Sequence, residues 1–170
     1  MEQKTWLDNR AINRIVETYS DMLLRIAINR TQNLSEAEDI VQSVYVRLMT
    51  AQPRFRDETH ERSWLIRTAV NLCKDYGRSA ARRTSIPLDE QAAAALPEEA
   101  VEVLDAVRRL PETERYAVYL YYYEGMPIRQ IARILDEPEG TVSSRMFRAR
   151  KKLKKLLKGD DHAAVSDWIR

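Results

Sequence analysis

The sequence predicts an all-α protein of two small helical domains joined by a short linker. Three observations predict this fold class. Apolar residues recur at helical spacing along most of the 170-residue chain, strand signals are weak, and only four Gly and six Pro interrupt it. After residue 83 the composition changes to proline, alanine and acidic residues without a large apolar stripe. We expect a first domain at residues 1–83, a linker at 84–98, a second domain at 99–158 and a tail at 159–170.

Three helices are expected in the first domain, at about residues 9–29, 35–49 and 61–82, with a loop at residues 51–60. Ser35 is the expected N-cap of the second helix, because Glu38 three residues later completes a capping box. The lone Cys73 lies in an apolar helical context and is expected to be a buried thiol. The inward stripes are Ile12, Ile15, Val16, Tyr19, Leu23 and Ile26, then Ile40, Val41, Val44 and Leu48, then Trp64, Leu65, Thr68, Leu72 and Tyr76.

The second domain is expected to begin with helices at residues 98–110 and 112–124, joined at Pro111. A short helix with apolar residues at helical spacing follows, and a break at residues 136–137 separates it from a last helix that opens at Pro138 and ends before Gly159. The stripes of these two helices are Ile128, Ile131, Ala132 and Leu135, then Val142, Met146, Ala149, Leu153 and Leu156. This layout predicts a helix-turn-helix.

The last helix has two different faces. Ser144, Arg148, Lys151 and Lys155 lie opposite its apolar stripe, and residues 141–158 contain eight Lys or Arg and no acid. A helix that packs on one side and is cationic on the other suits the groove of a nucleic acid. The alternative is a surface helix whose charges are merely solvated.

The net charge of +2 conceals a strong segregation of charge along the chain. Residues 61–83 carry six basic and two acidic residues, whereas residues 84–140 carry five basic and twelve acidic ones. Two cationic segments are therefore separated by an acidic one. This pattern predicts two separate contacts with anionic partners.

Several classes of function lack their sequence signals. The chain has no apolar run long enough to span a membrane, no signal peptide, no nucleotide-binding Gly-x-x-x-x-Gly-Lys loop, and only two His with one Cys. We therefore expect a cytoplasmic protein that is not an enzyme, holds no metal and needs no cofactor.

Two groups of motifs resemble the sigma-70 superfamily of bacterial transcription initiation factors, specifically the small extracytoplasmic-function (ECF) group. The first group is AEDIVQSVYVRL at residues 37–48 with SWLIRTAVNLCKD at 63–75. The second is LPE at residues 110–112 with PEGTVSSR at 138–145. The resemblance covers residues 12–158 and implies two helical domains, called regions 2 and 4, without a region 3 between them.

The resemblance also implies a role for the second helix. This helix matches region 2.2, which docks on the coiled coil of the largest subunit of RNA polymerase. Asp39 and Gln42 would be its polar contacts with the polymerase core, among the apolar neighbours Val41 and Leu48. An amphipathic helix that gives one face to its own core and another to a partner is compatible with this role.

Residues 53–83 match regions 2.3 and 2.4, which open the promoter and read its −10 element. The implied contacts with −10 DNA are Arg54, Phe55, Arg56, Asn71, Lys74, Arg78, Arg82 and Arg83. Phe55 is the candidate for stacking on a flipped base, although it could instead anchor its loop. Trp64 lies on the apolar stripe and is expected in the core.

The last helix matches region 4.2, which enters the major groove at the −35 element. Ser144, Arg145, Phe147 and Arg148 occupy the implied DNA-reading positions, and Lys151, Lys152 and Lys155 are expected to grip phosphates. Phe147 could touch a thymine methyl group or pack internally. Ser143 stands where many members of the family have a longer basic residue, so the −35 sequence of a relative does not transfer directly.

The resemblance implies a sigma factor that directs core polymerase to promoters and is itself controlled by an anti-sigma factor, often membrane-bound. The alternative is a sigma-like module that titrates an anti-sigma factor without binding DNA. A dimeric helix-turn-helix repressor would explain residues 127–158 but not residues 35–83. Some of the clustered tyrosines are expected in the core and others at the surface; these are Tyr116, Tyr119, Tyr121, Tyr122 and Tyr123.

Overall fold

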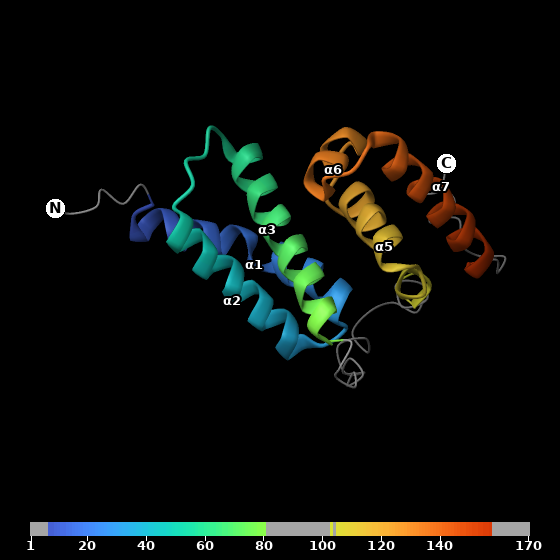
Figure 1. Cartoon of the computed structure of the whole chain (residues 1–170), viewed down its shortest axis with the longest axis horizontal. Coiled ribbons are helices and arrows are strands. Elements are labelled where there is room, and N and C mark those ends of the chain that lie inside the picture. Colours follow the sequence, from blue (N-terminus) through green and yellow to red (C-terminus); the bar gives the residue numbers. More distant parts are fainter. Residues whose placement is uncertain (1–6, 81–102, 104, 158–170) are drawn as a thin grey trace. The chain divides into compact units, whose positions relative to one another are not determined.

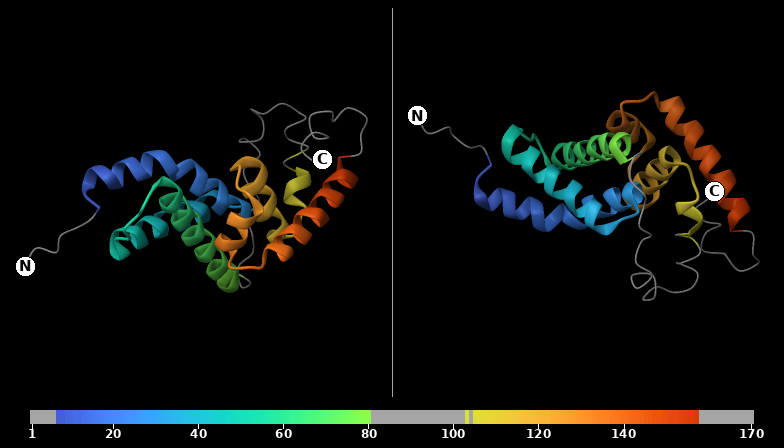
Figure 2. Two further views of the ribbon diagram at one scale, coloured as in Figure 1. Left: turned by 90° about the horizontal axis from the view of Figure 1, so that it is seen from above. Right: turned by 60° about the horizontal axis from the view of Figure 1, so that its bottom comes forward.

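The protein is described here by a computed structural model that covers residues 7–80, 103 and 105–157. The chain divides into two compact units, Met1–Leu88 (unit 1) and Asp89–Arg170 (unit 2). All regular elements of the described residues are helices (Figures 1 and 2), which confirms the expected all-α class. The expected linker at 84–98 lies outside the described residues, as does the tail at 159–170 with the expected helix end at Gly159.

Unit 1 consists of three helices, α1 (Asn9–Thr31), α2 (Leu34–Ala51) and α3 (Glu58–Ala80). Each helix packs against the other two, as Figure 1 shows. The centre of their core is fully buried and contains Ile15, Leu23, Ile26, Val44, Leu48, Leu65, Ile66 and Val70. Cys73 is also fully buried, which confirms the expected structural thiol.

The N-cap of α2 is Asn33, so the prediction of Ser35 was wrong. Asn33 has the extended backbone that a cap requires (φ −139°, ψ 126°), and its side-chain oxygen accepts a hydrogen bond from the Glu36 amide at 3.1 Å. Gln32 before it adopts the left-handed conformation that ends α1. Since the turn between α1 and α2 is this tight, Ser35 already lies inside the first turn of α2.

The loop between α2 and α3 is shorter than the expected residues 51–60. Helix α2 continues to Ala51, and α3 begins at Glu58 rather than near residue 61. Asp57 causes the early start, because its carboxylate accepts a hydrogen bond from the His60 amide at 2.7 Å. Its carbonyl accepts a further bond from the Glu61 amide at 3.0 Å.

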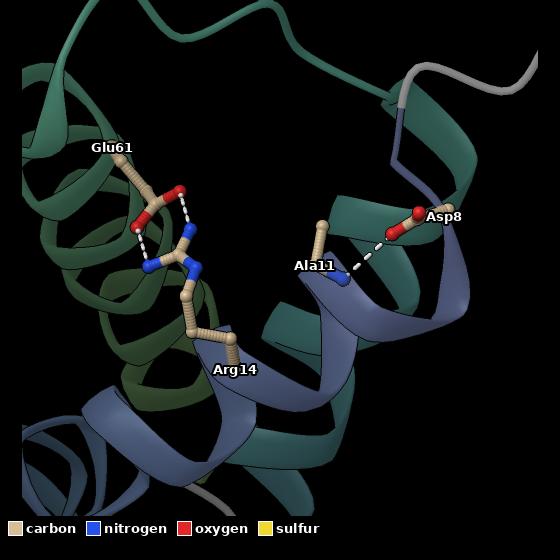
Figure 3. Close-up of polar contacts among 4 residues, drawn as sticks. All are labelled: Asp8, Ala11, Arg14 and Glu61. Atoms are coloured by element: carbon tan, nitrogen blue, oxygen red, sulfur yellow. Dashed lines mark hydrogen bonds and ion pairs between the residues drawn. The ribbon is translucent and has the colours of Figure 1, made fainter.

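A buried carboxylate ties α1 to α3 in unit 1. The Arg14 guanidinium donates two hydrogen bonds to the Glu61 carboxylate, at 3.0 and 2.6 Å, and Glu61 is only 4% exposed (Figure 3). The bidentate geometry is the strong form of this contact. Hydrogen bonding to Glu61 raises the pKa of Arg14 above its usual range. In the same view, the Asp8 carboxylate caps α1 by accepting the Ala11 amide at 2.8 Å.

Burial raises the pKa of Tyr19 and of Tyr45 above the usual tyrosine value of 10.0, because it disfavours the phenolate. Unfolded tyrosines lose their protons near that value while the folded ones keep them, so this stabilisation is present below pH 10.0 and is lost as the pH rises above it. We expect the free energy of unfolding of unit 1 to fall between about pH 9 and about pH 11. Urea unfolding at several pH values measures this. The fall in the free energy of unfolding between these pH values should be smaller for Tyr19→Phe than for the wild type, and unchanged for the unit 2 control Tyr123→Phe.

Unit 2 contains α5 (Glu112–Val118), η2 (Tyr119–Tyr123), α6 (Ile128–Leu135) and α7 (Glu139–Leu156), preceded by helical residues at 105–108. The stripes of α6 and α7 face one core, in which Leu120, Met126, Ile131, Val142, Met146 and Ala149 are almost fully buried. At the end of α7 the prediction of Leu156 was wrong. Leu156 is 43% exposed and Leu157 is buried instead, because Leu157 lies four residues after Leu153 and its amide donates to the Leu153 carbonyl at 2.9 Å, so it continues the buried stripe.

The expected single helix at residues 112–124 is interrupted by a π-helical turn. In η2 the Glu124 amide donates to the Tyr119 carbonyl at 3.2 Å, five residues back, instead of four. Gly125 then ends the turn with a φ of +65°, a conformation that favours glycine. The turn stacks the rings of Tyr119 and Tyr123 at 5.3 Å. As expected, Tyr116 and Tyr119 are buried whereas Tyr123 is exposed.

Candidate functional site

Helices α6 and α7 form a helix-turn-helix whose second helix presents a cationic surface. Asp136 makes the turn in the left-handed conformation, and the carbonyl of Pro138 accepts the first amide bonds of α7. The outer side of α7 carries a set of exposed side chains that we call the recognition surface: Ser144, Phe147, Arg148, Lys151 and Lys155. The opposite side is buried in the core of unit 2. The two faces expected from the sequence are therefore both present.

Phe147 is 68% exposed in the middle of the recognition surface. The sequence left open whether this ring packs internally, and its exposure excludes that possibility. A single exposed apolar side chain is common on protein surfaces, so the position of Phe147 among the cations is the informative observation. Its position fits the second possibility, an apolar contact with a base edge such as a thymine methyl group.

Two cations at the edge of the recognition surface are held by carboxylates. Arg145 pairs with Glu137 of the turn, and its side chain is only 16% exposed. Lys152 donates to both oxygens of the buried Glu114 carboxylate of α5, at 3.0 Å each. Sequence reasoning placed Arg145 and Lys152 with the DNA-contacting cations. In the structure both lie beside acids of unit 2, and Nε of Arg148 is 3.6 Å from Glu114 as well.

A third cation of α7 lies against the aromatic turn. The Arg150 guanidinium is 5.5 Å from the ring centre of Tyr121 and 5.7 Å from that of Tyr122, and its Nε donates to the Tyr122 hydroxyl at 2.8 Å. This contact fixes η2 against α7. It also directs the charge of Arg150 away from the recognition surface.

The candidate −10 residues of unit 1 lie in two places. Arg54 and Arg56 are exposed in the loop before α3, whereas Asn71 and Lys74 lie in the second half of α3. Asn71 is exposed and Lys74 is half-buried. Of the remaining candidates, the side chain of Arg78 and the whole of Arg82 and Arg83 are outside the described residues.

Phe55 packs edge-on against two rings. Its ring centre is 5.8 Å from that of His60 and 5.9 Å from that of Trp64. The half-buried Trp64 is thus in contact with the loop as well as with its own helix. Of the two roles left open for Phe55, these contacts support the anchoring of the loop.

On α2, two of the four residues expected to contact the polymerase core are exposed and two are buried. Asp39 and Gln42 are exposed, but Val41 is 9% and Leu48 0% exposed, so both lie in the core of unit 1 and are not available to a partner. Two apolar side chains that the sequence did not single out, Val46 and Met49, are 57% and 46% exposed on this side of α2. The helical spacing of residues 39, 42, 46 and 49 could have found them. We call Asp39, Gln42, Val46 and Met49 the docking surface.

The fold and these surfaces define a class of protein: a two-domain helical protein whose second unit holds a helix-turn-helix with a cationic second helix, the layout of many DNA-binding proteins. Comparison with known proteins narrows the class. Residues 15–83 match the family Sigma-70 region 2, and residues 100–153 match Sigma-70, region 4. No helix of the described segments has the length and apolarity needed to cross a membrane.

Individual relatives agree with both matches. The ECF RNA polymerase sigma factor SigM of Mycobacterium tuberculosis is 32% identical, over 88% of this chain and 79% of SigM. The structure of CnrH in complex with the cytosolic domain of CnrY is similar at 26% identity and a TM-score of 0.68, over 91% of this chain and 92% of that one. The sigma factor RpoE in complex with the anti-sigma factor NepR from Bartonella quintana has the same fold at 22% identity and a TM-score of 0.71, over 89% and 99% of the two chains.

This chain belongs to the ECF group of the sigma-70 family of RNA polymerase sigma factors. Proteins of this family regulate transcription by directing RNA polymerase to promoters.

Proposed function

We propose that this ECF sigma factor reads a promoter at two places and docks on core polymerase through a third surface. The recognition surface of α7 contacts the −35 element, the cations of unit 1 hold the −10 element, and the docking surface of α2 binds the polymerase. The observation that carries the proposal is the recognition surface, since it is exposed and cationic on a helix-turn-helix. A helix of this kind fits the major groove of B-DNA.

Within the recognition surface, Arg148 is the proposed reader of a base and Phe147 its apolar companion. Arg148 is half exposed and has N–H groups in the planar arrangement that guanine recognises. Ser144 offers a hydroxyl one turn earlier, and Lys151 and Lys155 supply phosphate contacts, which position the helix without reading sequence. Arg145 joins this set only as a secondary contact, because Glu137 holds its side chain.

Opening of the −10 element requires the capture of bases that leave the stack. We assign phosphate contacts to Arg54 and Arg56 of the loop and to Lys74 of α3, and a hydrogen bond with a base to Asn71. Phe55 holds the loop in place through its ring contacts. The proposed set also includes three arginines at the end of the cationic segment, Arg78, Arg82 and Arg83.

A regulating partner is the last part of the proposal. CnrH, to which this chain is similar, has been solved with the cytosolic domain of CnrY bound. By analogy we propose an anti-sigma factor as a partner of this chain, and a cytoplasmic, non-enzymatic role. The alternative module that only titrates an anti-sigma factor has no use for a cationic recognition surface, and the presence of this surface favours the DNA-binding function.

Transcription in vitro tests the proposed function. The full chain mixed with bacterial core polymerase should give discrete transcripts from a genomic fragment library, whereas core polymerase alone should not. Absence of both core binding and promoter-specific transcripts would reject the sigma function and favour the titrating module.

Replacement of Arg148 by alanine should weaken −35 recognition selectively. Loss of one bidentate base contact corresponds to a loss of promoter affinity of roughly tenfold or more, and core binding should not change. The control Arg109→Ala removes an exposed arginine that pairs with Asp105 at 2.7 Å, distant from α7 in the sequence. Competition binding of the holoenzyme to a promoter with intact or scrambled −35 sequence measures the effect. An equal loss of core affinity would contradict the assignment.

A further inference from the structure

A buried acid beneath the recognition helix contacts two of its cations. Glu114 lies on α5 and is only 4% exposed. Its carboxylate accepts two hydrogen bonds from the Lys152 ammonium at 3.0 Å each, and one of its oxygens is 3.6 Å from Nε of Arg148. Arg148 and Lys152 are one helical turn apart, so a single carboxylate faces both.

The two cations are affected differently by this carboxylate. The Lys152 ammonium is directed to Glu114, although its side chain is 45% exposed. Nε of Arg148 is 3.6 Å from a Glu114 oxygen, an ion-pair distance longer than a hydrogen bond, and the Arg148 side chain remains 55% exposed. An arginine that meets a carboxylate through Nε keeps its two terminal nitrogens for other acceptors, such as the two on a guanine edge.

We propose that Glu114 is a positioning residue for −35 recognition, an inference that rests on the proposed function. It holds Arg148 in the orientation that reads a base, and it withholds Lys152 from the DNA phosphates. Phosphate contacts add affinity for every sequence, whereas base contacts add discrimination. Glu114 therefore lowers affinity for arbitrary DNA and raises the preference for the −35 sequence.

A purely structural role would be a clamp between α5 and α7. Unpaired buried charges are costly, so an acid at this place needs cationic partners in any case. A clamp, however, would act on all DNA sequences alike. Its loss would destabilise unit 2 and weaken specific and non-specific binding together. The positioning role predicts that the two change in opposite directions.

Glu114→Gln tests this difference, because it removes the charge and keeps the shape of the side chain. Asp105→Asn is the matched control, since it makes the same change of charge at an exposed ion pair in the same unit. The specific probe is a promoter whose −35 sequence has been selected by the wild-type holoenzyme from a randomised library. The non-specific probe is the same DNA with a scrambled −35 sequence, and both are bound to holoenzyme assembled with the full chain.

We expect Glu114→Gln to lower the ratio of specific to non-specific affinity by roughly tenfold, since Arg148 loses its orientation. With the free full chain and scrambled duplex, the slope of log affinity against log salt should become steeper by about 0.9, because Lys152 gains one phosphate contact. Asp105→Asn should leave both quantities at the wild-type values. An unchanged ratio and slope in Glu114→Gln, or an equal loss on both probes, would overturn the proposal.

A second pair of variants keeps the test decisive if Glu114→Gln does not fold. Lys152→Gln should leave the salt slope on scrambled duplex unchanged, whereas Lys151→Gln, on the exposed surface, should make it shallower by about 0.9. Equal shallowing in both variants would show that Lys152 grips a phosphate and would overturn the proposal. Failure of the sigma function itself is distinguishable, because the wild-type holoenzyme would then select no −35 sequence at all.

Discussion

Val46→Asp and Met49→Asp should each lower the affinity of the chain for core polymerase by roughly thirtyfold or more. Both side chains are about half exposed on α2 beside Asp39 and Gln42. If this surface docks on the polymerase, the substitution removes an apolar contact and places an unpaired carboxylate in the interface. Fluorescence anisotropy of the labelled chain titrated with core polymerase measures the loss.

A loss of folding has to be excluded as the cause of weaker binding. Exposed positions of α2 do not contribute to the core of unit 1, so these substitutions should leave its stability unchanged. Leu34→Asp is the matched variant: Leu34 is also an exposed apolar residue of α2, at 50%, but it lies at the start of the helix and outside the docking surface. It should bind core polymerase like the wild type. The thermal midpoints of all three variants should stay close to that of the wild type. Core affinity of Val46→Asp and Met49→Asp equal to that of Leu34→Asp would exclude this side of α2 from docking.

Replacement of Arg14 by methionine should lower the free energy of unfolding of unit 1 by about 2 kcal/mol, because the pair is buried on the Glu61 side while the Arg14 side chain is 48% exposed. The substitution keeps an apolar stem of similar length but leaves the Glu61 carboxylate, 4% exposed, without the guanidinium that pairs with it. Amide hydrogen exchange of peptides from α1 and α3 measures the change within unit 1 itself. Those peptides should exchange faster, while peptides from α7 should exchange at the wild-type rate.

Two variants separate the loss of the pair from the loss of an arginine. Arg10→Met removes an exposed arginine of the same helix and should have an effect within about 0.5 kcal/mol of zero. Arg14→Met combined with Glu61→Met should recover most of the lost stability, because no charge is then left buried. A double variant as unstable as Arg14→Met alone would show that packing of the arginine stem, rather than its charge, supports this site.

The helices of both units follow from local patterns in the sequence. The stripe from Val142 to Leu153 predicted the buried side of α7, and the lack of acids from residue 141 to residue 158 predicted its cationic side. Family motifs then gave the two units their roles. Periodicity has this power because a helix fixes which side chains share a face.

The deviations arise where a choice depends on a distant partner or on the backbone. Helical spacing placed Val41 on the inward stripe of α2, where the structure buries it; the role in polymerase docking came from the resemblance, which does not show which side chains the core covers. The contact between Glu114 and Lys152 spans 38 residues, so no local pattern shows which cation of α7 is paired. The π-helical turn of η2 likewise depends on a backbone hydrogen bond to the fifth residue back instead of the fourth, and residue preferences do not specify this choice.

The exposed ring of Phe147 gives the binding of this helix a calorimetric signature. Contacts between cations and phosphates release counterions and depend on salt, but they remove little apolar surface from water. A phenylalanine that is 68% exposed in the free protein and covered by a base edge in the complex adds a negative heat-capacity change. If Phe147 contacts a base edge as proposed, the ring should gain no such cover on arbitrary DNA. The heat-capacity change of binding should therefore be more negative for DNA that carries the recognised −35 sequence than for DNA that is bound only through its phosphates.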